Sequence, residues 1–105
     1  MDLDEALRQL RAELEELYGE RLRGLYLFGS RARGDAEPDS DVDVAVVLDD
    51  FESVYTEIRR MSEVGARTSL DLDLHVSLIP VREADWREGT SIFLRNVARE
   101  GVSVH

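Results

Sequence analysis

Two carboxylates stand at the start of an apolar run over residues 41–48, Asp-Val-Asp-Val-Ala-Val-Val-Leu. The run is rich in Val, which favours a β-strand, whereas Asp is depleted from strands. Residues two apart on a strand point to the same face, so Asp41 and Asp43 would project side by side, about 6–7 Å apart. Either they lie on the wet face of a half-exposed sheet, or they hold a hard divalent cation such as Mg²⁺, which binds carboxylate oxygens.

A second acidic pair follows in residues 68–79, Thr-Ser-Leu-Asp-Leu-Asp-Leu-His-Val-Ser-Leu-Ile. Apolar and polar residues alternate there, which predicts a strand with Asp71, Asp73, His75 and Ser77 on one face. If this strand lies beside the first, about 4.8 Å away, up to four carboxylates share one face of the sheet. Like charges so close destabilise a sheet, and a bound cation removes the repulsion. We expect His75 to be a structural or wet-face residue rather than a ligand.

A turn is predicted at Gly29-Ser30, where the apolar run of residues 24–28 ends. Glycine permits a close backbone approach and unusual dihedrals, and successive N–H groups in such a turn form an anion-binding nest. Ser30 adds a hydroxyl that can bond a phosphate oxygen, and Arg31 and Arg33 can clamp phosphates. The alternative is an ordinary strand-to-helix turn, with Ser30 as its helix cap and the two arginines as solvated surface charges.

Helical and extended segments alternate around these residues. Leucines recur at steps of three and four over residues 3–17, which predicts a helix that Asp2 and Glu5 cap and Gly19 ends. Further helices are expected at 51–65 and 91–100, a loop that starts with one helical turn at 31–40, and strands at 24–28, 41–48, 68–79 and 102–105. This order predicts an α/β (α+β) fold, a mixed sheet of about four strands with helices packed on it.

The composition excludes several kinds of chemistry. The chain of 105 residues fits a single domain, 1–105. It has no Cys and only two His, which excludes disulfides and metal sites built on thiolates or clustered histidines. All 13 basic residues are Arg, which excludes a lysine-dependent phosphate loop and Schiff-base chemistry on lysine. A net charge of −10 disfavours nucleic-acid binding, no apolar stretch is long enough for a membrane span, and we expect a cytoplasmic protein.

Residues 27–48, LFGSRARGDAEPDSDVDVAVVL, resemble the signature of the DNA polymerase β-like nucleotidyltransferase superfamily: a Gly-Ser turn, ten residues, and an Asp-x-Asp strand. The chain is most similar to the minimal nucleotidyltransferase (MNT) group, and the similarity covers most of its length. The resemblance implies the polymerase β-like fold. It also implies that Gly29 and Ser30 hold a nucleoside triphosphate and that Asp41 and Asp43 ligate Mg²⁺.

The resemblance further implies a third carboxylate, on a separate strand, that ligates one metal and helps to deprotonate an acceptor hydroxyl. We expect Asp73 in this role, with Asp71 as the second choice, although family members generally show a single Asp at this position. Two metal ions about 3.5–4 Å apart would stabilise the attacking and leaving oxygens of an in-line displacement.

The function implied by the resemblance is that of a metal-dependent nucleotidyltransferase. It would transfer AMP from Mg-ATP to a hydroxyl of a partner protein, as the antitoxin of a HEPN-domain toxin. Two alternatives remain: an antitoxin that acts by binding alone, with an inactive metal site, and a small-molecule nucleotidyltransferase of the aminoglycoside-modifying kind. The second of these usually needs more chain to enclose its substrate.

Overall fold

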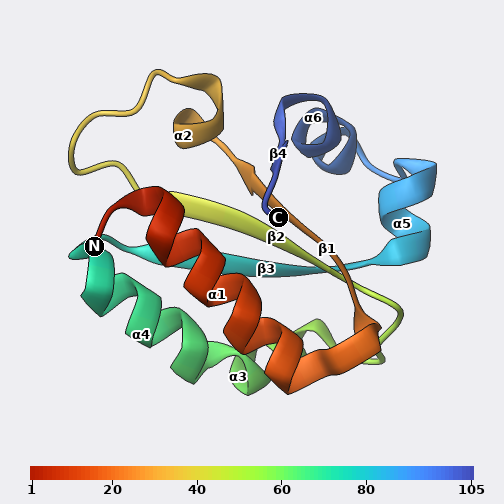
Figure 1. The fold of residues 1–105 in the computed structure, drawn as a ribbon. Helices are drawn as coiled ribbons and strands as arrows, with labels where there is room; N and C mark the ends of the chain where they lie inside the picture. Colours follow the sequence, from red (N-terminus) through yellow and green to blue (C-terminus); the bar gives the residue numbers. More distant parts are fainter.

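A four-stranded sheet with helices on both faces forms the protein (Figure 1). The computed structural model describes residues 1–105. In chain order the elements are α1 (Leu3–Tyr18), the 3₁₀ turn η1 (Gly19–Arg21), β1 (Leu22–Phe28), α2 (Ser30–Arg33), β2 (Val42–Leu48), α3 (Val54–Arg60), α4 (Ser62–Leu72), β3 (Val76–Arg82), α5 (Glu83–Glu88), α6 (Ile92–Glu100) and β4 (Val102–Ser103). No helix is both long and apolar enough to cross a membrane.

The sheet has the order β3-β2-β1-β4 and is mixed, as predicted. Strand β1 pairs antiparallel with β2 and β4, whereas β2 and β3 run parallel. Helices α1, α3 and α4 cover one face, and α2, α5 and α6 lie on the other (Figure 1). Both faces of β2 are therefore covered along most of its length, which explains why its sequence is an almost continuous apolar run.

Strand β2 sends alternate side chains into two separate cores. Val42, Val44 and Val46 belong to the larger core, beneath α1. Ala45 and Val47 belong to a smaller core on the opposite face, with residues of α5 and α6. By the same alternation Asp43 lies on the second face, at the end of the strand where α2 rather than α6 stands nearby.

Helix α1 begins and ends as the sequence predicts. The backbone N–H of Glu5 donates to Asp2 Oδ1 at 2.8 Å, and Gly19, with φ +58°, ends the helix. The buried side chains of the predicted stripe are Leu7, Leu10 and Leu14. This helix covers the face of the sheet away from Asp43, so its role is to support the sheet rather than to contribute to the site.

The predicted strand over residues 68–79 is wrong in its first half. Helix α4 runs to Leu72, and β3 begins only at Val76. The helix prevails because Met61, Val64 and Thr68 are buried at steps of three and four, whereas Leu70, an apolar member of the alternation, is 81% exposed. The expected helix over residues 51–65 is also two helices, because α3 ends at Arg60 and α4 continues through Gly65.

Strand β3 forms one edge of the sheet. The carbonyl of His75 accepts from Val42 N–H on β2, at 2.9 Å, which fixes the side of the strand that faces its partner. On the other side, Val76 N–H donates to Ser69 Oγ of α4 at 3.1 Å. The backbone nitrogen of Pro80 faces this same outer side, because alternate residues of a strand do so, and proline has no N–H that could remain unpaired there.

Candidate nucleotide site

The Gly-Ser turn joins the end of β1 to the single turn of α2. Gly29 has φ +75° and ψ −157°, a conformation that essentially only glycine adopts. Its carbonyl accepts from Ala32 N–H and Arg33 N–H, both at 3.1 Å, and so starts the helical turn. The backbone conformation therefore requires the glycine that the sequence reasoning singled out.

Asp43 lies directly against this turn. Phe28 and Asp43 are partners in the β1–β2 ladder, so the residue after Phe28 sits beside the carboxylate. A Cβ added to Gly29 would lie 2.6 Å from Asp43 Oδ2, closer than a non-bonded contact allows. The structure thus brings together the turn and the second carboxylate of Asp-x-Asp, which are 14 residues apart in the chain.

The charge of Asp43 is not neutralised within the chain. Partial burial raises the pKa of its carboxyl group, the neighbouring charge of Asp41 raises it further, and His75 lowers it. None of the salt bridges reaches Asp41 or Asp43, even though the chain has 13 arginines. An unneutralised pair of carboxylates beside a glycine turn has the electrostatics of a cation site.

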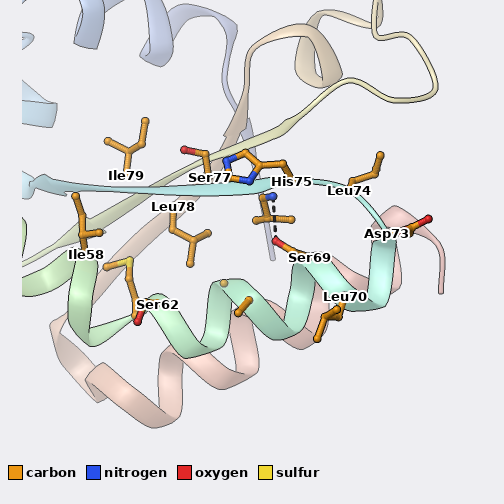
Figure 2. Close-up of a pocket in the computed structure, with 14 residues that line it drawn as sticks. Ile58, Ser62, Ser69, Leu70, Asp73, Leu74, His75, Ser77, Leu78 and Ile79 are labelled. Carbon is orange, nitrogen blue, oxygen red and sulfur yellow. Dashed lines mark hydrogen bonds between the residues drawn. The ribbon is translucent and has the colours of Figure 1, made fainter.

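Two polar residues of β3 lie beside the carboxylates. In the parallel ladder Ser77 is the partner of Asp43, and His75, one step before the Val42–Val76 pair, stands level with Asp41. His75 and Ser77 point to the same side of β3, away from Leu78 and helix α4 (Figure 2). The alternation predicts that His75 and Ser77 share one face, and the structure shows this; the ladder puts that face on the side of Asp43.

Asp71 and Asp73 do not join this group. Asp71 is an exposed residue of α4, and Asp73 ends that helix in the left-handed conformation, with φ +53°. In Figure 2 the Asp73 carboxylate lies at the end of the helix and points out of the molecule. The strand on which both were expected is a helix here, and no three acidic or histidine side chains converge as metal ligands in this conformation.

The two arginines after the turn are engaged in holding the loop and a helix. Arg31 donates from Nη2 to the carbonyls of Pro38 and Ser40, at 3.2 and 2.9 Å, and its buried Nε–H has no acceptor. Arg33 pairs with Asp35 at 3.2 Å and with Glu100 of α6 at 3.3 Å. Either arginine would have to give up these contacts to clamp a phosphate through the same nitrogens.

A groove of about 980 Å³ borders the site on the other side of β3. It runs between the β3 edge and helices α3 and α4, and most of its lining is apolar, including Ile58, Leu70 and Leu78 (Figure 2). His75 and Ser77 line the groove and also face the carboxylates. The edge of β3 is therefore where the groove and the candidate site meet.

The residues at the turn fit a divalent cation and a phosphate group. Asp41 and Asp43 supply the carboxylate oxygens that hard cations bind, and a bound cation would offset the repulsion between the two negative charges. Gly29 has no Cβ to fill the space next to Asp43, and Ser30 follows it at the start of α2. The chain thus offers carboxylate ligands for a cation beside a backbone that a phosphate can approach.

Comparison with known proteins agrees with this geometry. Residues 7–98 match the family model of the nucleotidyltransferase domain, so the chain belongs to this family. Two relatives from Methanocaldococcus jannaschii, MJ0604 and MJ0141, are named as candidate protein adenylyltransferases. MJ0604 is 38% identical over 105 residues, 96% of each chain. MJ0141 is 29% identical over 104 residues, 99% of this chain and all of the relative.

Solved structures of toxin–antitoxin proteins share this fold. A toxin–antitoxin structure with AMP-PNP has a TM-score of 0.69 and 21% identity, over 99% of this chain and 73% of the other. The MNT antitoxin solved with the tri-AMPylated HEPN toxin of Shewanella oneidensis has a TM-score of 0.55 and 20% identity, over 94% and 71%. The predicted nucleotidyltransferase family and fold are confirmed.

Proposed function

We propose that the protein is a protein adenylyltransferase that transfers AMP from Mg-ATP to a hydroxyl of a partner protein. The observation that supports the proposal is that the Gly29 turn lies against Asp43, the second carboxylate of the Asp-x-Asp pair. The relatives named as candidate protein adenylyltransferases support the choice of a protein acceptor.

In this proposal Gly29 and Ser30 hold the triphosphate, while Asp41 and Asp43 hold Mg²⁺, with two ions in all. The bound ions would offset the charge that develops on the phosphate oxygens during transfer. The acceptor oxygen forms a bond to the α-phosphorus, the bond to the β-phosphate oxygen breaks, pyrophosphate leaves, and the hydroxyl proton passes to water. The work of the protein is to align these groups rather than to form a covalent intermediate.

The proposed partner is a HEPN-domain toxin, which this chain would silence as an antitoxin in the cytoplasm. The proposal is supported by the MNT antitoxin of the same fold that was solved with an AMPylated HEPN toxin. The net charge of −10 suits a partner with a basic, RNA-binding face, because complementary charge steers association.

A second candidate, an antitoxin that acts by binding alone, is favoured by one observation. Asp73 and Asp71 do not lie with the carboxylate pair, so the chain shows no third carboxylate at the site. In that case Asp41 and Asp43 would serve no reaction, and silencing would rest on the interface between the two proteins.

Intact-mass spectrometry of the protein mixed with its proposed HEPN-domain partner distinguishes the two candidates. With Mg-ATP, the adenylyltransferase adds the mass of one or more AMP units to the partner. The Asp41→Asn, Asp43→Asn double variant should form the same complex and add nothing. A complex of wild-type protein that gains no mass with any nucleoside triphosphate contradicts the enzyme and leaves the binding antitoxin.

A further inference from the structure

We propose that His75 is a ligand of the cation held by Asp41 and Asp43, so that the metal site of this chain consists of two carboxylates and one imidazole. The inference rests on the proposed function, because it assumes that this carboxylate pair binds metal. It revises the expectation that His75 is a structural or wet-face residue.

The register of the sheet places His75 at the site. Asp43 and Ser77 are partners in the parallel ladder, and Asp41 and His75 each come one residue before its first pair, Val42 and Val76. The hydrogen bond from Val42 N–H to the His75 carbonyl, at 2.9 Å, continues that alignment to His75. The burial of Val42 and Val76 in the larger core sends the four polar side chains to the opposite face. They form a block about 4.8 Å wide and about 6–7 Å long, which one cation can bridge with side chains of this length.

Within this block His75 is the side chain that can complete the ligand set. Ser77 carries a neutral hydroxyl, which is a weak ligand, and Asp71 and Asp73 lie on or after α4. The ring of His75 takes part in none of the salt bridges, so no partner within the chain holds it.

The three groups do not converge in this conformation, but two of them are free to move. Asp41 and His75 are exposed, so each can turn about its side-chain bonds between staggered rotamers. Asp43, between the Gly29 turn and Ser77 of β3, is the partly buried member. Binding therefore requires the two exposed side chains to rotate toward the Asp43 carboxylate.

An imidazole ligand changes which metal the site prefers. Carboxylate oxygens suit Mg²⁺, whereas an imidazole nitrogen suits later divalent metals such as Co²⁺ and Ni²⁺. The site should thus bind Co²⁺ more tightly than Mg²⁺, and the preference should depend on His75. Since the chain has only two histidines, His105 provides a matched control for any binding to an exposed imidazole.

Calorimetric titration with Co²⁺ alone and with Mg²⁺ alone tests the inference on the folded protein without reference to activity. His75→Ala should weaken Co²⁺ binding by at least about tenfold, because the loss of even a supporting group at a metal site lowers affinity on that scale. It should weaken Mg²⁺ binding by much less. His105→Ala should leave both unchanged. In nitrogen-detected NMR spectra, substoichiometric Co²⁺ should broaden the His75 ring signals before those of His105.

The outcomes separate failure of the inference from failure of the proposed function. Suppose that Asp43→Asn abolishes Co²⁺ binding, that His75→Ala binds Co²⁺ like wild type, and that Co²⁺ leaves the His75 ring signals of the wild-type protein sharp. Then His75 is not a ligand, and the carboxylate site stands. If neither Asp43→Asn nor Asp41→Asn weakens binding of either metal, the carboxylate pair is not the metal site, and the inference falls with the proposed function.

Discussion

Replacement of Gly29 by Ala should abolish nucleotide transfer while the fold persists. Gly29 has φ +75° and ψ −157°, where a residue with a side chain costs about 1–3 kcal/mol. Small domains are stable by about 5–15 kcal/mol, so the variant should fold. At about 4–8 °C per kcal/mol, its melting temperature should fall by roughly 4–24 °C.

The effect on the site is larger than the effect on the fold. The new Cβ would lie 2.6 Å from Asp43 Oδ2, and ordinary contact begins at 3.4 Å, so Asp43 must move by about 0.8 Å, the difference of the two. A shift near 1 Å in a reacting arrangement can lower a rate by about 100-fold. We expect at least that loss in AMP transfer to the partner protein, and a matching loss of affinity for Mg-AMP-PNP by calorimetry.

Gly34→Ala is the matched control. Gly34 ends α2 with φ +83°, so the substitution also puts a side chain at positive φ, but nothing lies within 4 Å of the added Cβ. It should lower the melting temperature and leave nucleotide affinity unchanged. The reasoning is refuted if folded Gly29→Ala binds nucleotide as wild type does, or if Gly34→Ala loses as much affinity as Gly29→Ala.

Two further substitutions test the electrostatics and the core. Asp43→Asn should raise the melting temperature of the metal-free protein at neutral pH, because burial and Asp41 raise the pKa of Asp43 and its charge therefore opposes folding. This gain in melting temperature should shrink as the pH falls through the raised pKa of Asp43 toward the ordinary Asp value of 3.8, because wild-type Asp43 is then itself protonated. A gain that does not depend on pH would contradict this cause. Tyr18→Phe removes the 2.9 Å hydrogen bond that the tyrosine donates to buried Glu57, and should cost about 1–3 kcal/mol in a denaturant titration at unchanged m-value.

Local signals in the sequence were sufficient for the first half of the chain. The Asp2 cap, the leucine stripe of α1 and the Gly29 turn are each fixed by neighbouring residues, and all are found in the structure. The continuous apolar run of β2 likewise reflects a central strand that is covered on both faces. The Asp-x-Asp pair could be placed because its spacing alone decides which face it shares.

The segment after α3 could not be read in this way because two periodicities overlap there. Leu70, Leu72 and Leu74 alternate with polar residues as in a strand, while Met61, Val64 and Thr68 repeat as in a helix. Packing against α1 decides for the helix, and that contact is not visible in the sequence. The stripe of buried residues was the available signal, but one of its members is the polar Thr68.

The positions of the arginines were equally hidden from the sequence. Arg31 and Arg33 follow the turn at a spacing that suits phosphate, yet their donors reach carbonyls of the loop at Pro38 and Ser40 and the carboxylate of Glu100. These partners lie between 7 and 67 residues away in the chain. Pattern alone gives the type of side chain near a site, but only the folded chain decides which charges remain free for a ligand.

The outer side of β3 has a consequence for how the protein meets other chains. The N–H of Val76 already donates to Ser69, and Pro80 has no N–H. The N–H of Leu78 is therefore the only backbone donor between them that can reach another strand. A strand from another molecule could form only a broken ladder there, which protects this edge against runaway association into aggregates. A protein that docks along the outer edge of β3 must therefore be recognised through its side chains, and not through main-chain hydrogen bonds between two strands.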